Sequence, residues 1–253
     1  MKVNDYLKRI QYTGRLEPTA ELLSSLHYFN LLWVPFENLD IHLGRPMRLD
    51  EQHLYDKIVN QERGGFCYEL NGLFAWMLRA LGYQVDLLSS EVYQDGEFSP
   101  EFDHLALRVR LEEDWLVDVG FGDSFVRPLN LFDEREQIQR DTAYRIEQSL
   151  NYKVLLHQDG GGNWEPIYRF TLEPRQLSDY TGRCRYHQTS PESHFKQKRV
   201  CTRLTEEGRI TIRDERLIEA KNGRRREAKI SDDESYLAAL EEHFGVRLPA
   251  FQE

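Results

Sequence analysis

The sequence lacks any long apolar run. No stretch approaches the roughly 20 apolar residues that a membrane-spanning helix needs, and the opening residues, MKVNDYLKRIQY, carry no apolar stretch of signal-peptide length. Positive charge is also in short supply, since 33 Lys and Arg stand against 43 Asp and Glu, a formal net charge of −10. An acidic surface repels nucleic acid and anionic lipid. We therefore expect a cytoplasmic protein that binds neither nucleic acid nor membranes.

Cysteine is scarce as well. The three cysteines, Cys67, Cys184 and Cys201, are odd in number and scattered, which fits free thiols in a reducing compartment better than a disulfide framework. The cysteines show no CxxC spacing and the histidines no HExxH pair, so we expect no metal site. Internal repeats, low-complexity tracts and Pro/Ser-rich linkers are missing too. Any subdivisions should therefore pack closely against each other.

What the sequence does contain is a first third with helical periodicity. Apolar residues follow helical spacing from Pro18 to Phe29, and a shorter helix is expected around Leu54 to Val59. From Leu70 to Leu81 apolar residues recur on one face, and Gly82 follows where a left-handed terminating residue is favoured. This last segment predicts an amphipathic helix.

The middle of the chain has the two-residue period of strands. Apolar and polar residues alternate from His104 to Leu111, and a turn at 112–114 leads into WLVDVGF, which predicts a β-hairpin. A closing helix is expected from Glu234 to Phe244. Further strands are expected at 152–157, 167–172 and 209–213. Helices first, then antiparallel strands, then a helix indicate an α+β fold.

Cys67 stands in the stretch RGGFCYELN, at the expected first turn of a helix. A lone cysteine on the apolar side of a helix is usually a packing residue. In the first turn, however, unpaired amides and the helix dipole favour an anion, and a cationic neighbour lowers the pKa of a thiol there. Gly64 and Gly65 are expected to leave room for a substrate at the sulfur, or simply to form a tight turn. Asn71, at i+4, is expected beside Cys67.

A cysteine nucleophile needs a base, and the base usually needs a third group that fixes its tautomer. His104 opens the segment HLALRV, and Asp118 lies in the apolar segment LVDVGF, where a buried carboxylate needs a partner. Taken alone, His104 is better explained as a surface or capping residue, and structural hydrogen bonding explains Asp118 equally well. With a turn at 112–114, Asp118 faces Arg108, and His104 lies roughly 13 Å further along the strand. A hydrogen bond between the two then requires a shifted or bulged register, or a segment that bends back.

Five segments together resemble one known family, the arylamine N-acetyltransferases. RGGFCYELN is similar to the family's signature around its catalytic cysteine, DHLALRV to its histidine strand, and WLVDVGFGDSFVRPL to its aspartate strand with a glycine-rich continuation. WVPFENLDIH resembles the family's early loop, and KNGRRREAKISDDESYLAALEEHFGV its C-terminal end. The resemblance runs in order along nearly the whole chain.

The resemblance implies a fold of three parts around a core similar to that of cysteine proteases. A helical bundle with the nucleophile is expected at 1–84, an antiparallel β-barrel with the histidine and aspartate at 85–185, and an α/β lid at 186–253. These boundaries come from the family pattern, because the sequence has no linker to mark them.

The same resemblance implies the activity and the triad. Cys67 is expected to be the nucleophile, His104 the base and Asp118 the orienting carboxylate. Family members transfer an acetyl group from acetyl-CoA to an arylamine, hydrazine or arylhydroxylamine through an acetyl-cysteine intermediate, which gives ping-pong kinetics. Acetyl-CoA is thus the expected cosubstrate, and a monomer and a homodimer are both open.

Supporting residues are also implied by the resemblance. Arg63 and Glu37 are expected to pair and to tie the early loop to the cysteine turn, although two solvated charges are the simpler interpretation. Phe36 and Phe125 match positions that line the family's acceptor pocket, where ring faces contact an aromatic amine. Core packing explains both aromatic residues almost as well.

Coenzyme A brings phosphates that an acidic protein must meet with local donors. Gly122, in VGFGDSF, is one of two glycines whose amides can approach phosphates, a weak signal beside a full phosphate-binding motif. Lys196, with Lys198 and Arg199, adds positive charge in a segment that resembles the family's cofactor side. The run 224–226 is interpreted as a solvated turn. His27, His187 and His194 are interpreted as ordinary polar or capping residues.

Two alternative functions remain open at this point. A papain-like or transglutaminase-like hydrolase uses the same Cys, His and Asp arrangement to cleave amides, and differs in letting water resolve the acyl-enzyme. A non-enzymatic module that binds CoA or an arylamine would keep the fold with an unreactive thiol.

Overall fold

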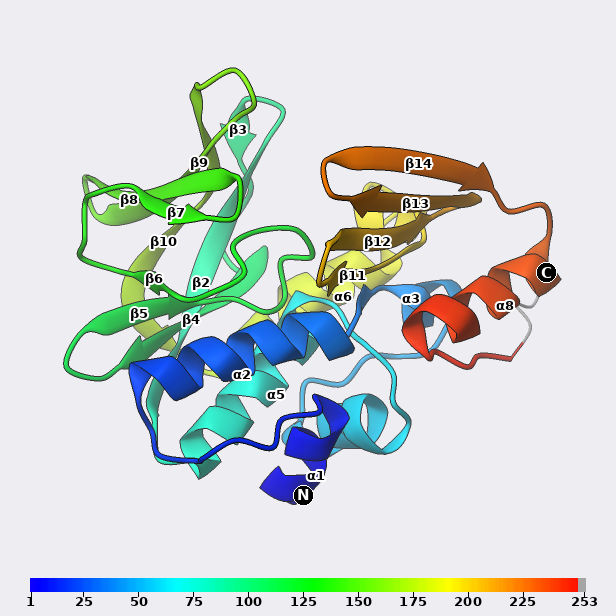
Figure 1. Ribbon diagram of the computed structural model, residues 1–253, viewed down its shortest axis with the longest axis horizontal. Coiled ribbons are helices and arrows are strands. Elements are labelled where there is room, and N and C mark those ends of the chain that lie inside the picture. The colour runs from blue at the N-terminus through cyan, green and yellow to red at the C-terminus, as the bar shows by residue number, and fades with distance from the viewer. Residues whose placement is uncertain (250–253) are drawn as a thin grey trace.

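The first third of the chain is helical, as the apolar spacing predicts. The computed structural model describes residues 1–249, and most of these helices lie together beneath two sheets (Figure 1). They are α1 (Val3–Arg9), α2 (Ala20–Trp33), α3 (Leu39–His42), α4 (Glu51–Tyr55), the π-helix η1 (Asp56–Asn60) and α5 (Cys67–Ala80). Helix α2 begins where the Thr19 side chain accepts a hydrogen bond from the Leu22 amide, at 3.2 Å, and ends before Pro35.

Helix α5 is the buried centre of the helical part. Its apolar face is fully buried at Leu73, Phe74, Met77 and Leu78, and each such side chain contributes roughly 1.5–3 kcal/mol of apolar burial. At its start the Glu69 carboxylate accepts a hydrogen bond from the Phe66 amide, at 3.1 Å. The helix ends before Gly82, whose φ of 96° is the left-handed conformation expected there.

A nearly closed, barrel-like antiparallel sheet follows. Its strands are β2 (Gln84–Gln94), β4 (His104–Arg110), β5 (Asp114–Val117), β6 (Leu129–Asn130), β7 (Gln137–Gln139), β8 (Thr142–Ser149), β9 (Tyr152–Gln158) and β10 (Trp164–Arg175). They are arranged in the order β6-β5-β4-β2-β10-β9-β8-β7, and the short β3 (Glu97–Phe98) pairs with β2. Helix α5 packs against β4 and β2. The barrel therefore sits directly on the helix that begins at Cys67 (Figure 1).

Strands β4 and β5 form the predicted hairpin, but with a different register. The turn occupies residues 111–113, so it is centred one residue earlier than expected, and the facing residues shift by two. Continued by one residue, this register brings Asp118 opposite Ala106 rather than Arg108. His104 is then a diagonal neighbour of Asp118 on the same face, about 7–8 Å away along the backbone. The separation of 13 Å, which assumed a turn at 112–114, does not occur, and the shifted register is the alternative that the structure has. Long side chains can bridge the gap that remains.

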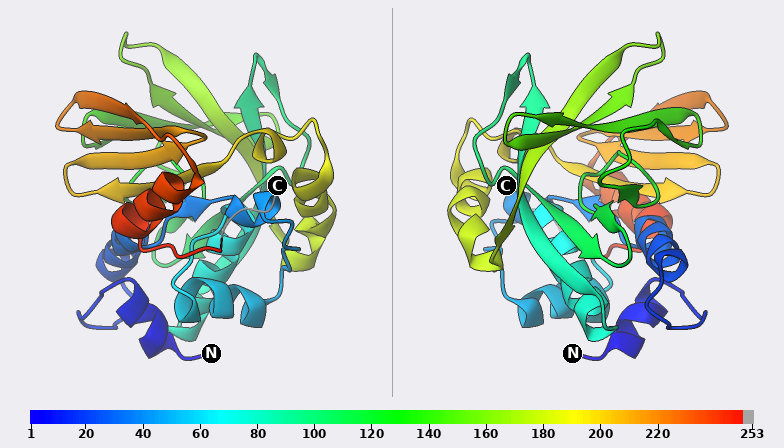
Figure 2. Two further views of the ribbon diagram at one scale, coloured as in Figure 1. Left: turned by 90° about the vertical axis from the view of Figure 1, so that its right-hand side faces the viewer. Right: turned by 90° about the vertical axis from the view of Figure 1, so that its left-hand side faces the viewer.

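The C-terminal part forms a second sheet of five antiparallel strands. It consists of β1 (Phe36–Glu37), β11 (Val200–Thr205), β12 (Gly208–Arg213), β13 (Arg216–Lys221) and β14 (Arg224–Lys229), in that order. Helix α8 (Asp233–Phe244) lies against one face (Figures 1 and 2). The link from the barrel contains the 3₁₀-helix η2 (Leu177–Tyr180), α6 (Thr181–Thr189) and α7 (His194–Gln197). The run 224–226, interpreted above as a turn, instead begins the exposed edge strand β14, where charged residues discourage further pairing.

The predicted α+β architecture is thus present. One strand pairing crosses the predicted division into three parts. Strand β1 comes from the first segment and pairs with β11 of the third. The expected boundary at 84/85 falls at the start of β2, and that at 185/186 falls inside α6. The three-part division stays a prediction, and its last residues, 250–253, lie outside the described residues.

A cluster of five buried charges lies under the segment that leads to Cys67. Arg63 pairs with Glu37 at 2.7 Å and with Asp40 at 3.0 Å, and Lys57 pairs with Asp40 and Glu69 at 2.8 Å each. The pair of Arg63 and Glu37 implied by the family resemblance is therefore present. Because each charge is buried away from water, removal of any one member leaves another charge without a partner and destabilises the fold.

Replacing Arg63 by Met should be strongly destabilising. The substitution leaves three buried carboxylates with one cation, and breaking a buried pair in this way costs roughly 3–5 kcal/mol. Urea unfolding checks this, with Arg135→Met as the matched control, because the Arg135 side chain is 87% exposed and that of Arg63 only 3%. The control should leave the unfolding midpoint unchanged. Equal midpoints for the two variants would show that the cluster does not stabilise the fold.

Candidate active site

Cys67 is the first residue of α5 and is only 3% exposed. Burial raises the pKa of the Cys67 thiol well above its ordinary value, and the carboxylates of Asp103 and Asp118 raise it further, while a hydrogen bond with the Leu105 backbone acts in the opposite direction. Position at a helix N-terminus therefore does not by itself keep this sulfur ionised, and the cationic neighbour named in the sequence analysis is needed as well. A thiolate at this place needs a partner that takes up the proton.

Two glycines fix the backbone around Cys67. A Cβ atom at Gly64 would lie 2.0 Å from the Pro35 carbonyl oxygen, and one at Gly120 would lie 2.9 Å from the Cys67 Cα atom. On the same side, the Gly65 amide donates to the Pro35 carbonyl, at 3.3 Å. The space beside Gly64 is thus filled by the residue that precedes β1. Of the two alternatives for this glycine, a tight turn fits and room for a substrate does not. Gly120 is the glycine that lies against the cysteine.

His104 and Asp118 are joined directly. The His104 Nε2 atom lies 2.7 Å from one carboxylate oxygen of Asp118, and both side chains are buried. Burial alone would raise the pKa of Asp118, but the His104 ring, the Asn71 side chain and the Gly120 amide lower it below its ordinary value. Asp118 is therefore a carboxylate in the folded protein, and it fixes the orientation of the imidazole.

Asn71 connects this pair to the helix of the cysteine. Its side-chain amide donates to the second Asp118 oxygen at 2.8 Å and to the Leu105 carbonyl at 2.6 Å, and its oxygen accepts from the Val119 amide at 2.9 Å. Since Asn71 lies one helical turn after Cys67, these bonds set the distance between the thiol and the aspartate.

The thiol and the imidazole line one cavity, with a volume of about 160 Å³. Cys67 and His104 both line it, with the rings of Phe36, Phe121 and Phe195 around them. His104 also meets Phe121 edge-on, at 5.2 Å between centroids. The cavity thus presents a thiol and an oriented imidazole within an aromatic wall.

The sequence matches a family model described as N-acetyltransferase over residues 19–252. The arylamine N-acetyltransferase of Escherichia coli (strain K12) is 34% identical over 252 residues, which cover 96% of this chain and 88% of the relative. The chain belongs to the arylamine N-acetyltransferase family.

Solved structures of the family agree with this assignment. An arylamine N-acetyltransferase from Salmonella typhimurium has a TM-score of 0.91 at 31% identity and covers 96% of this chain and 90% of its own. That of Mycobacterium marinum in complex with CoA has a TM-score of 0.89 at 29% identity, with 97% and 93% covered. This member of the family is accordingly an enzyme, an acyltransferase, and the predicted fold class is confirmed.

The predicted substrate-binding residues of this arylamine N-acetyltransferase lie in three different places: at the cavity, in the barrel core and on the surface. Phe36 lines the cavity, and Gly122, with a φ of 93°, lies beside the Phe36 ring. Phe125 instead is 1% exposed in the barrel core, where it stacks on His27 at 5.6 Å, so core packing describes it. Lys196 is exposed on α7.

Several residues of the cavity were not assigned to the site from the sequence, and two of them are charged or titratable and lie in contact. His187 and Asp103 both line it, 3.1 Å apart. Although burial acts against it, hydrogen bonds and charges from His187 and Arg183 lower the pKa of Asp103 to about 2. Asp103 directly precedes His104, and His187 opens the segment HQTSPESHF, which directly precedes Lys196.

His27 is a further missed residue, buried behind Asp118. Its Nδ1 atom lies 3.1 Å from the Val126 carbonyl oxygen. Its Nε2 atom lies 3.0 Å from the Asp118 carbonyl oxygen and 3.3 Å from the Asp118 amide nitrogen. Burial lowers the pKa of His27 to about 4, so the ring is neutral at pH 7. A lone histidine on an apolar helix gives no sequence signal of this role.

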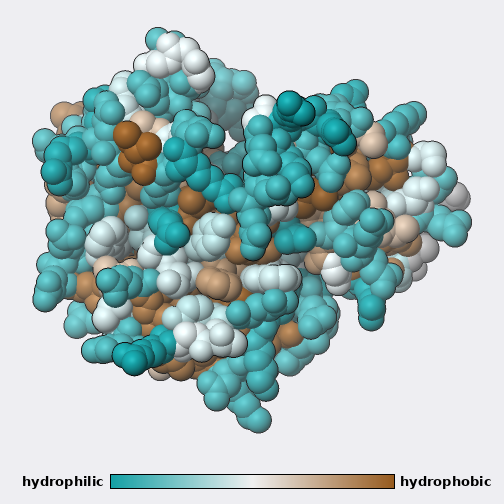
Figure 3. Space-filling view, in the orientation of Figure 1, coloured by the Kyte–Doolittle hydropathy of each residue, from teal (hydrophilic) through white to brown (hydrophobic). Residues whose placement is uncertain are grey.

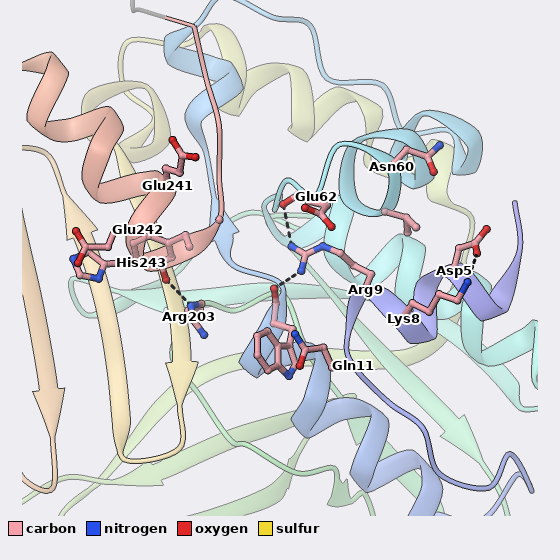
Figure 4. A pocket seen from close by; sticks show the side chains of 14 residues that line it. Asp5, Lys8, Arg9, Gln11, Asn60, Glu62, Arg203, Glu241, Glu242 and His243 are labelled. Atoms are coloured by element: carbon pink, nitrogen blue, oxygen red, sulfur yellow. Dashed lines mark hydrogen bonds and ion pairs between the residues drawn. The ribbon is translucent and has the colours of Figure 1, made fainter.

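A larger cavity, of about 620 Å³, lies elsewhere, between α1, the end of α2 and the end of α8 (Figure 4). Charged side chains of both signs surround it. Arg9 donates to the Trp33 carbonyl at 2.6 Å and Arg203 to the Leu32 carbonyl at 2.7 Å, so the two arginines cap the end of α2. No residue of the triad lines this cavity.

Residues 1–249 contain no group of three or more His, Cys, Asp or Glu arranged to hold a metal ion. Within the same part of the chain, no helix has the length and apolar character to cross a membrane. Cys67, Cys184 and Cys201 are free and buried.

Stability should fall in acid because of His27. Its pKa is about 4 in the fold and about 6.5 in the unfolded chain, so between these values the unfolded chain binds more protons. The stabilisation is complete above pH 6.5 and is lost as the pH falls towards 4, by on the order of 3 kcal/mol. Urea unfolding over this range should show a flatter dependence in His27→Gln than in the wild type. The control His53→Gln should keep the wild-type slope, and an unchanged slope in His27→Gln would contradict the assignment.

Proposed function

We propose that the protein transfers an acetyl group from acetyl-CoA to the nitrogen or oxygen of an arylamine, hydrazine or arylhydroxylamine, by a ping-pong mechanism through acetyl-Cys67. The observation that carries this proposal is the shared cavity, in which a buried thiol and an imidazole bound to Asp118 face the same space. The complex of the Mycobacterium marinum relative with CoA supports acetyl-CoA as the donor.

The first half-reaction begins with a proton transfer. Because burial disfavours the isolated Cys67 thiolate, the thiol gives its proton to His104, and the Asp118 carboxylate stabilises the resulting imidazolium. The sulfur then attacks the thioester carbonyl, and the bond from that carbon to the CoA sulfur breaks. CoA leaves as a thiol with the proton from His104, and acetyl-Cys67 remains.

The second half-reaction uses the same groups in reverse. The neutral amine attacks the acetyl carbonyl while His104 takes up one amine proton, and the bond to the Cys67 sulfur breaks. The amide leaves, and the thiolate and imidazolium are restored. Asn71 and Gly120 both donate to the Asp118 oxygen that His104 does not use, and so hold the carboxylate in place through both halves. The imidazole therefore does not turn.

The aromatic wall supports an aromatic acceptor. Phe36, Phe121 and Phe195 line the cavity together with Cys67, and ring faces and edges of this kind bind flat aromatic molecules. A small apolar cavity also excludes water once the acceptor is bound. This favours transfer to an amine over the hydrolysis that a papain-like enzyme performs.

Incubation with acetyl-CoA in the absence of amine should add one acetyl group to the chain. Intact-mass measurement followed by peptide mapping should place it on Cys67, since Cys184 and Cys201 are buried and do not line this cavity. Cys67→Ser should remain unmodified, while Cys184→Ser should be acetylated like the wild type. An unmodified wild-type chain, or acetylation that survives in Cys67→Ser, would refute the acetyl-cysteine mechanism.

Addition of an arylamine such as aminosalicylate to the acetylated enzyme should give the N-acetylated amine. The expected ratio of amide to free acetate is well above one, because the aromatic wall holds the amine at the acetyl group. Chromatography of the products measures it. Free acetate alone would instead identify a hydrolase.

A further inference from the structure

The C-terminal sheet has two unlike faces. On one face, Cys201, Ile210 and Ile212 pack against α8. The opposite side, called here the inner face, carries the alternate residues of the same strands. By the strand register it includes Thr202, Thr211 and Ile218 in one row, with Arg213, Arg216 and Arg225 beside them.

The inner face begins at the catalytic cavity. Phe36 lines that cavity and pairs with Thr202 across β1 and β11. Arg209, also on the inner face, donates to the Gly122 carbonyl and pairs with Asp123 at 2.9 Å, so this face looks towards the barrel. Figure 3 shows the surface hollowed between the barrel and the C-terminal sheet. A long ligand whose reactive end lies at Cys67 can therefore continue along the inner face.

Arginines outnumber carboxylates at the far end of this face. Arg216 lies 3.4 Å from one oxygen of Glu227, and Arg225 bonds to the other at 2.6 Å. Within residues 1–249, no carboxylate is in ion-pair contact with Arg213. A cavity of about 500 Å³ lies over these side chains. Two of the three guanidinium groups thus share one carboxylate and the third has none, in a protein whose formal net charge is −10.

Two other carboxylates at this cavity are already engaged. Asp214 accepts a hydrogen bond from the Arg199 amide at 2.9 Å, and Glu215 faces Lys229 at 3.8 Å. Neither of them forms an ion pair with Arg213, Arg216 or Arg225. The cavity is lined by four arginines, Arg199 included, and three carboxylates, so it retains positive charge for an anionic ligand.

Sheet geometry gives the distance from the cavity to these arginines. From Phe36 to Arg213 the path crosses two strands and runs two residues along the third, about 12 Å, and Arg216 is one strand further, at about 16 Å. The pantetheine arm of CoA, with its two amide units, is comparable to four or five extended residues, about 15 Å. A thioester at Cys67 therefore places the pyrophosphate within reach of the arginines.

We propose that Arg213, Arg216 and Arg225 bind the phosphate groups of coenzyme A, with the pantetheine arm lying along Thr202 and Thr211 on the inner face. Guanidinium groups match phosphate oxygens with two parallel hydrogen bonds, which suits this role better than isolated lysines. The inference rests on the proposed acetyl-CoA reaction and names the residues that select a phosphorylated donor over a bare thioester.

The test compares two acetyl donors, acetyl-CoA and S-acetyl-pantetheine, which lacks the phosphates. For Arg213→Gln the KM for acetyl-CoA should rise about tenfold, with a further rise in the Arg213→Gln/Arg216→Gln double variant, because each loses a charge-assisted bond. The kcat, and both constants for S-acetyl-pantetheine, should stay near the wild-type values. Arg213→Lys should recover part of the affinity, and high salt should raise the KM for acetyl-CoA more in the wild type than in the double variant.

Arg226→Gln is the matched control, because Arg226 lies on the same strand but on the opposite face, paired in register with Glu219. It should leave every constant unchanged. The proposal is overturned if the double variant keeps the wild-type KM for acetyl-CoA, or if it loses both donors equally. Failure of both donors to acetylate wild-type Cys67 would instead overturn the proposed function itself.

Discussion

The active site depends on one buried carboxylate. Asp118 binds His104 with one carboxylate oxygen, and Asn71 and the Gly120 amide with the other. Its backbone amide and carbonyl both contact the His27 ring. These partners come from β4, α5, the loop after β5 and α2. A charge buried to this extent is tolerable only when its hydrogen bonds are complete. The carboxylate therefore fixes where the barrel sits on the helices, and with it the position of the imidazole relative to the sulfur.

A second constraint acts from the other side of the sulfur. Strand β1 hydrogen-bonds to Gly65 just before Cys67 and pairs with β11 of the C-terminal sheet, and the charge cluster around Arg63 holds the segment below it. The C-terminal sheet is thereby joined to the backbone that carries the nucleophile. The two residues of β1, Phe36 and Glu37, therefore position both the Phe36 wall of the cavity and the inner face of the C-terminal sheet.

Much of this arrangement follows from the sequence, and the exceptions have physical causes. Helical periodicity located α2 and α5, and alternation located the β4–β5 hairpin, because one buried face dominates each element. The pairing of β4 with β5 was not predicted correctly, because a turn centred one residue earlier shifts every facing pair by two residues. The composition of the turn does not specify its position that closely. His27, Asp103 and His187 were missed because their roles come from contacts between distant segments. Phe125 packs in the barrel core, the alternative left open for it in the sequence analysis, because a family motif does not tell a core aromatic residue from one that lines a cavity.

The central claim is that Cys67 is reactive only through His104, since its burial opposes ionisation. The most direct measurement is the rate of Cys67 alkylation by iodoacetamide as a function of pH, followed by peptide mapping, in the wild type and in His104→Gln. We predict that the wild type reacts readily at neutral pH and that His104→Gln reacts only well above the ordinary thiol pKa of about 8.5. Identical pH profiles for the two proteins would contradict the account.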